Sequence, residues 1–124
     1  MKKILLTLII SCVFANLIWA TSENTKNGSD KNTIYSYITK AQSTIKEALS
    51  KSDLQTIQEL AYKAKRFSYS AQCEADECDY DYAEDECENA AFKADRACRA
   101  SSIAEAKDYL NKALSHLAKA KNSL

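Results

Sequence analysis

The sequence predicts an all-α protein: an antiparallel four-helix bundle built from two helical hairpins, disulfide-stapled, after a cleaved signal peptide. Three observations support this prediction. The 124 residues include no Pro and a single Gly, the two residue types that most oppose a helix interior. From residue 32 onward, apolar residues recur at steps of three and four, which is the spacing of one helix face. Four of the five cysteines lie between Cys73 and Cys98.

Residues 1–20 have the pattern of a secretory signal peptide. Lys2 and Lys3 form a positive start, an apolar segment follows, and Ala20 places a small residue at the cleavage point. Lipidation at Cys12 is one alternative, although the residues after it are still apolar, where a lipidated cysteine normally begins a polar tether. Retention as a membrane helix is another, although an apolar run of about 17 residues is at the lower limit for spanning. We expect cleavage after Ala20 and a secreted or periplasmic protein.

The mature chain divides into a short leader and a helical domain. Residues 21–31 are rich in Ser, Thr, Asn and Lys, a composition typical of disorder, and residues 32–124 form the bundle domain. The first helix is predicted over residues 32–49. Its apolar face consists of Ile34, Ile38, Ala41, Ile45 and Ala48.

The second helix is predicted over residues 53–76. Ser52 and Gln55 have the spacing of a capping box, in which each side chain satisfies a backbone amide at the helix start. Leu60 and Phe67 widen the apolar face of this helix. The face itself consists of Leu54, Ile57, Ala61, Ala64, Ser68, Ala71 and Ala75.

The third and fourth helices are predicted over residues 82–100 and 103–121, with a second capping box at Ser102 and Glu105. Their apolar faces are Ala83, Cys87, Ala90, Ala94 and Ala97, and then Ile103, Ala106, Leu110, Ala113 and Leu117. A weak repeat relates the two hairpins at an offset of 49 residues, and duplication and chance similarity both stay open. Two such units are too few for a solenoid, so a closed bundle is favoured.

The cysteines are interpreted as structural. Cleavage after Ala20 leaves four of them, an even number in an oxidising compartment, and their spacing matches neither a zinc knuckle nor a redox pair. Beyond the leader the chain has 12 Ile and Leu residues against 17 Ala, so its core is thin. A disulfide contributes ~2–4 kcal/mol to stability, and we expect disulfides to compensate for the small apolar core.

Cysteine pairing follows from the predicted faces. Cys78 and Cys87 both continue inward-facing series and flank the turn, so we expect them to pair. Cys73 and Cys98 are then paired by elimination, although unbroken helices would hold Cys98 ~16 Å from Cys87. A bond between Cys73 and Cys87 stays open.

Charge is unevenly distributed. Residues 74–88, which we call the acidic turn, carry nine carboxylates and no Lys or Arg. Without residues 1–20 the chain has 15 basic and 17 acidic residues, so everything outside the acidic turn has a net charge of +7. The basic residues are dispersed without a basic run, which argues against nucleic acid as a partner.

The acidic turn is a weak candidate for cation binding. Counting Glu77 as the first position of a calcium-binding loop places carboxylates at its ligand positions, namely Glu77, Asp79, Asp81, Asp85 and Glu88. However, Tyr82 occupies the position that requires Gly. Weak attraction of cations by the whole patch is the broader form of this hypothesis, and a solvated acidic surface is the simpler interpretation.

No group of residues has the pattern of a catalytic site. His116 lacks a nucleophile or carboxylate partner nearby in sequence, so we expect it on the surface. Tyr80 and Tyr82 in the acidic turn are candidates for contact with a partner protein, although they can equally edge the core. We expect a non-enzymatic protein without cofactors that acts by binding or a structural role in the cell envelope or extracellular space, with cation binding as the alternative.

Overall fold

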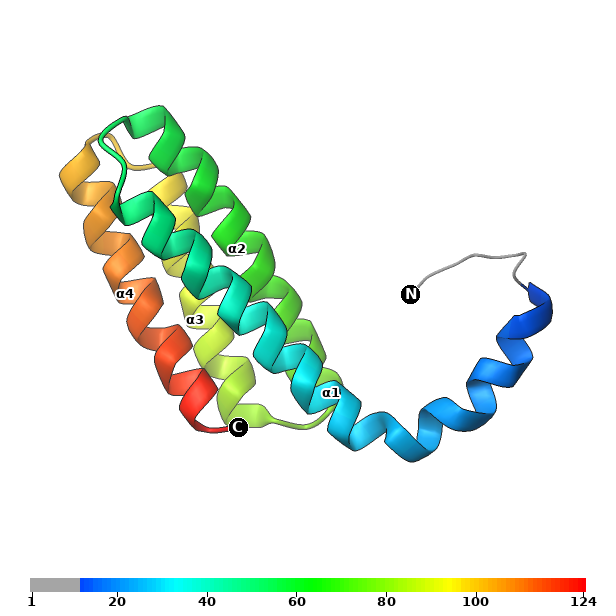
Figure 1. Ribbon diagram of the computed structural model, residues 1–124. Helices are drawn as coiled ribbons and strands as arrows, with labels where there is room; N and C mark the ends of the chain where they lie inside the picture. Colours follow the sequence, from blue (N-terminus) through cyan, green and yellow to red (C-terminus); the bar gives the residue numbers. More distant parts are fainter. Residues whose placement is uncertain (1–11) are drawn as a thin grey trace.

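The computed structural model describes the backbone of residues 12–124 and the side chains of residues 31–124. Over this part of the chain it contains four helices and no strand: α1 (Cys12–Leu49), α2 (Leu54–Glu77), α3 (Asp81–Cys98) and α4 (Ile103–Asn122). The four helices lie side by side and alternate in direction (Figure 1), which confirms the all-α bundle. The predicted signal peptide and leader fall outside the described side chains, apart from Lys31, and stay predictions.

Each helix packs mainly against its neighbours in sequence. The contacts between α1 and α2, α2 and α3, and α3 and α4 are extensive, whereas α4 meets α1 over a smaller region. Among the described residues, no helix is long and apolar enough to cross a membrane.

The buried face of each helix is the one that the sequence predicts. All five predicted positions of α1 and all five of α3 are buried. Leu54 and Ile103, the first residues of α2 and α4, are only half-buried, as is Phe67. The large, fully buried apolar side chains are Ile34, Ile38, Ile45, Ile57, Leu110 and Leu117, each worth about 1.5–3 kcal/mol. Alanines occupy most of the remaining core and allow the helices to approach closely.

The two hairpins have matching corners, by which we mean the short connections between α1 and α2 and between α3 and α4. α1 ends at Leu49 and α2 begins at Leu54, while α3 ends at Cys98 and α4 begins at Ile103. Both boundaries are therefore displaced by the 49 residues of the sequence repeat. The corners also touch, because the Gln58 side-chain amide donates a hydrogen bond of 2.9 Å to the Ala100 carbonyl.

The helix caps differ from the prediction at one corner. At the second corner the Ser102 hydroxyl accepts from the Glu105 amide at 3.1 Å, as predicted, and the Glu105 carboxylate accepts from the Ser101 amide. At the first corner the predicted cap at Ser52 is wrong by one residue. Asp53 is the N-cap, and its carboxylate accepts from both the amide and the hydroxyl of Thr56, because a carboxylate can satisfy two donors at once.

A tight turn of three residues connects α2 to α3. Asp79 has φ 63°, and its amide donates to Asp76 while the Tyr80 amide donates to Ala75. This is the Schellman pattern of helix termination. Glycine usually occupies the left-handed position, but Asp and Asn tolerate it better than other residues do. Tyr80 completes the motif by packing against the core.

The predicted disulfide bonds are absent. Within residues 31–124, no disulfide joins Cys73, Cys78, Cys87 or Cys98. Cys87 lies six residues into α3, so it is about 9 Å along the axis from the start of that helix, whereas Cys78 caps the end of α2. Disulfide geometry requires Cα atoms within about 7 Å. The Cys78–Cys87 prediction therefore misjudged the height of Cys87 in the bundle.

The other two pairings are excluded by position and direction. Cys98 ends α3, about 25 Å along the axis from Asp81, while Cys73 lies near the opposite end of the bundle, one turn before the end of α2. Cys73 and Cys87 lie at similar heights, but Cys73 is exposed and Cys87 is fully buried. The helices therefore pack without these staples.

Candidate binding surface

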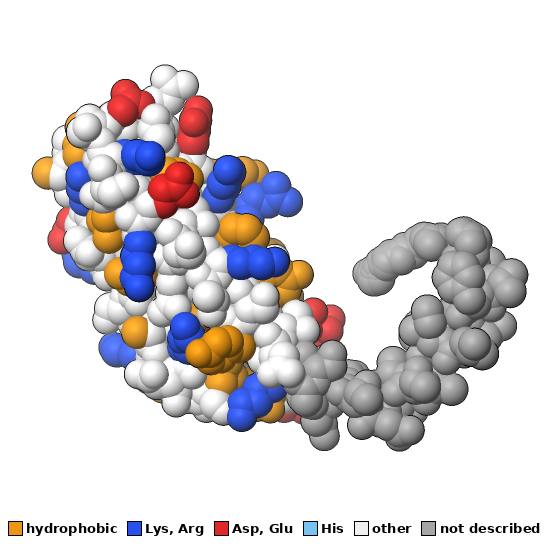
Figure 2. Space-filling model, in the orientation of Figure 1, with side chains coloured by type: hydrophobic (Ala, Val, Ile, Leu, Met, Phe, Trp, Pro, Cys, Tyr) orange, Lys and Arg blue, Asp and Glu red, His pale blue; other side chains and the backbone are white. Residues whose placement is uncertain are grey.

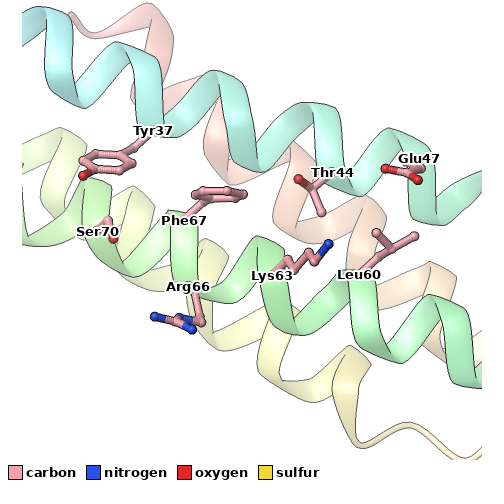
Figure 3. A pocket seen from close by; sticks show the side chains of 8 residues that line it. All are labelled: Tyr37, Thr44, Glu47, Leu60, Lys63, Arg66, Phe67 and Ser70. Carbon is pink, nitrogen blue, oxygen red and sulfur yellow. The ribbon is translucent and has the colours of Figure 1, made fainter.

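A groove of about 450 Å³ runs between α1 and α2. Its lining residues are Tyr37, Thr44 and Glu47 from α1 and Leu60, Lys63, Arg66, Phe67 and Ser70 from α2. In Figure 3 the rings of Tyr37 and Phe67 lie between the two helices, whereas Arg66 points away from α1. The α2 side covers residues 60–70, or about 15 Å of helix.

Helical spacing explains why these side chains line one groove. Tyr37 and Thr44 are seven residues apart on α1, and Lys63 and Ser70 are seven apart on α2, so each pair lies on one side of its helix. Both pairs flank the buried faces described above. Thr44 and Ser70 are short side chains among the larger ones that line the groove.

Positive charge lies over the aromatic rings of the groove. The Lys40 ammonium is 5.6 Å from the Tyr37 ring centre and 5.9 Å from that of Phe67, within the range of cation–π attraction. Lys40, Lys63 and Arg66 form no ion pair with any described residue. Figure 2 shows Lys and Arg side chains interspersed with hydrophobic ones across this face. The groove therefore combines apolar area with an excess of positive charge, since Glu47 is the one carboxylate among its lining residues.

The structure distributes the five candidate cation ligands over two helices and a turn. Glu77 ends α2, Asp79 lies in the turn, and Asp81 starts α3. Asp85 and Glu88 lie further along α3 and are exposed. The connection is too short for a calcium-binding loop, because most of the predicted loop positions are helical. Among the described residues no cluster of three or more potential ligands could hold a metal ion.

The carboxylates of the acidic turn nevertheless influence one another. The pKa of Glu84 is raised, first by desolvation and then by the charges of neighbouring carboxylates, with Asp76 and Asp85 the largest. Asp79, Asp81 and Asp85 form no ion pair with a described residue. The charges of these three carboxylates are therefore not neutralised by a described residue.

The two tyrosines predicted as partner contacts lie in different environments. Tyr80 is half-buried against the core, whereas Tyr82 is 54% exposed and its hydroxyl hydrogen-bonds to Glu86. Of these two tyrosines, Tyr82 therefore has the more exposed ring.

His116 is not an isolated surface residue, so that prediction is wrong. Its Nδ1 atom lies 2.7 Å from Oε1 of Glu86, and both side chains are largely buried. The hydrogen bond from His116 lowers the pKa of Glu86. Burial opposes this effect more weakly, so the pKa lies below its ordinary value. The pair joins α3 to α4, and the Tyr82 hydroxyl also hydrogen-bonds to Glu86.

The environments of Cys73, Cys87 and Cys98 disfavour the thiolate form. Burial, with a smaller contribution from Glu86, raises the pKa of Cys87 to about 12. Burial also raises the pKa values of Cys73 and Cys98. Because the thiolate is the reactive form, these environments disfavour thiol chemistry.

Sequence reasoning missed most of the exposed rings. Tyr35, Tyr62, Tyr69 and Phe92 are all about half exposed. Their positions outside the apolar faces were a usable signal, because an aromatic residue away from the helix stripe has no core to enter. The groove itself required knowledge of which sides of α1 and α2 meet.

Comparison with known proteins gives no match to a family model, a curated protein or a solved structure. Function is therefore inferred from the groove and the distribution of charge.

Proposed function

We propose that this chain is an exported small helical protein that acts by non-catalytic binding in the cell envelope or extracellular space, and that the groove between α1 and α2 receives a helix of a protein partner. The single observation behind this proposal is the groove itself. It is open, carries the rings of Tyr37 and Phe67, and is edged by cations that form no ion pair within residues 31–124.

The dimensions and chemistry of the groove suit a helix. A helix in a groove is anchored by apolar side chains at spacings of three and four residues, and the 15 Å of α2 that line the groove correspond to about three helical turns. Burial of apolar area contributes about 25 cal/mol per Å². Lys63 and Arg66 at the edge would favour a partner with carboxylates and increase its rate of association.

A variant that fills the groove tests the proposal. Ser70→Trp places an indole in the groove, and Ser115→Trp, at an exposed position of α4, is the matched control. Zero-length coupling of amines to carboxylates is carried out on cells that produce each variant, and proteins joined to Lys63 are identified by mass spectrometry. We expect coupled partners with the native chain and Ser115→Trp but not with Ser70→Trp. Equal coupling in all three would contradict the proposal.

Export has its own test. The N-terminal residue of the protein isolated from an envelope or culture fraction should be Thr21, because cleavage is predicted after Ala20. A chain found in the cytoplasm with Met1 would contradict this part of the proposal.

Cation attraction by the acidic turn is the second candidate. It is supported by the carboxylates whose charges raise the pKa of Glu84. Any binding would be diffuse rather than through a coordinated site, since no ligand cluster exists among the described residues. Titration calorimetry with calcium is the test, and absence of heat at millimolar calcium would contradict it.

A further inference from the structure

Between Lys63 and Glu77, the exposed edge of α2 changes from basic to acidic. Lys63 and Arg66 lie in its first part, Ser70 in the middle, and Cys73 and Glu77 towards its end. The steps between these positions are three and four residues, so they form one row on the helix surface. Lys63, Arg66 and Ser70 also line the groove between α1 and α2.

The row is complementary to itself in the reverse direction. Lys63 and Glu77 are each seven residues from Ser70, or about 10 Å along the axis. If two α2 helices lie antiparallel with their Ser70 residues opposite each other, each Lys63 faces a Glu77. The same arrangement sets Arg66 opposite Glu74, another carboxylate of the acidic turn.

Charge and size at the row favour such a contact. Lys63, Arg66 and Glu77 are exposed, and none forms an ion pair with a described residue. Ser70 is the smallest side chain of the row and sits at its centre, where two helices would approach most closely. The basic and acidic parts lie on one rigid helix, so they cannot neutralise each other within a single molecule.

We propose that the helix received by the groove is α2 of a second copy of this chain, in an antiparallel dimer whose two-fold axis passes near Ser70. This inference rests on the proposed function, and it names the partner of the same groove. The contact is isologous, so it closes at two copies. A single helix pair buries less than the ~1,200 Å² typical of stable interfaces, so the dimer is weak and sensitive to salt.

Charge reversal provides the test. Dimerisation is measured by sedimentation velocity on the chain as isolated from the cells that produce it. Lys63→Glu or Glu77→Lys alone replaces two attractions per dimer by repulsions, and we expect association about tenfold weaker. The Lys63→Glu/Glu77→Lys double variant restores opposite charges and should dimerise like the native chain. Lys93→Glu, the same charge change on α3, is the matched control and should leave dimerisation unchanged.

A second measurement reports the two-fold axis directly. Ser70→Cys places one new thiol at the centre of the contact, and mild oxidation should join two copies through the substituted position, as identified by peptide mapping. Ser115→Cys should give no such product.

The outcomes separate this inference from the proposed function. A native chain that stays monomeric at high concentration and low salt overturns the dimer, as does failure of the double variant to regain association. If Lys63 is then coupled in cells to a different protein and Ser70→Trp abolishes that coupling, the groove function stands and only the identity of the partner is wrong.

Discussion

Glu86 of α3 and His116 of α4, thirty residues apart in sequence, approach to 2.7 Å between Oε1 and Nδ1. This contact links two helices of the second hairpin by polar side chains at the edge of an apolar core. Because hydrogen bonds to charged groups contribute more than neutral ones, its removal has a measurable effect on stability.

The first prediction concerns Glu86→Gln. The folded-state pKa of Glu86 lies below its unfolded value, so its ionised form stabilises the fold above the unfolded pKa, near 4.5. That contribution disappears as pH falls through the folded pKa. In urea unfolding, the variant should be less stable by about 1–2 kcal/mol at pH 6, and the difference should shrink at pH 3. Glu88→Gln, at an exposed carboxylate of α3, is the control, and an equal loss there would contradict the assignment.

The second prediction concerns thiol reactivity. With a pKa of about 12, about 1 in 100,000 Cys87 side chains is ionised at pH 7. In the native chain, iodoacetamide should therefore modify the exposed Cys73 first and Cys87 last, as followed by mass spectrometry. Discovery of a disulfide at either residue in the isolated protein would contradict the structure and revive the pairing expected from sequence.

The third prediction distinguishes the two possible caps of α2. Asp53→Ala removes the acceptor of two hydrogen bonds from Thr56 and should lower the thermal unfolding midpoint. Ser52→Ala should leave it unchanged, because Ser52 is not the N-cap. The reverse order would favour the capping box predicted from sequence.

The fourth prediction concerns Ser68, a buried polar residue of α2. Its hydroxyl has no hydrogen-bond partner among the described residues, and an unsatisfied buried polar group costs about 1–3 kcal/mol. Ser68→Ala should therefore raise the free energy of unfolding by about 1 kcal/mol more than Ser115→Ala, which changes only helix propensity at an exposed site. Chemical denaturation of both variants gives this difference.

The fifth prediction concerns the turn between α2 and α3. Asp79→Gly relieves the left-handed backbone of a residue with φ 63° and should stabilise the fold by up to about 1 kcal/mol. Asp81→Gly, two residues later within α3, should destabilise it because glycine weakens a helix. Thermal denaturation of the two variants distinguishes them, and the same sign for both would contradict the turn geometry.

Sequence periodicity was sufficient for the helices and for which face of each is buried. Ile38, Ala64 and Leu110 are examples, since burial of a helical stripe depends only on local spacing. The matching corners also followed from the 49-residue repeat. Side-chain contacts between helices did not follow from the sequence, because Glu86 and His116 meet only once the rotation of α3 against α4 is fixed.

The errors at the cysteines and at the cap of α2 have different physical origins. Cys78 and Cys87 were paired by facing direction, but their heights along the bundle depend on a turn that ends α2 without a glycine. Asp53 rather than Ser52 caps α2, because one oxygen of its carboxylate accepts from both the amide and the hydroxyl of Thr56. The groove was beyond sequence reasoning, because it depends on which sides of α1 and α2 meet.

The packing of each helix mainly against the next one in the chain has a kinetic consequence. Most native contacts between helices require closure of a short loop only, and they do not depend on distant parts of the chain meeting first. Helical proteins of this topology fold within microseconds to milliseconds. Stopped-flow or temperature-jump relaxation of this chain should therefore show a single phase in that range, with no slow step from proline isomerisation because the sequence has no proline.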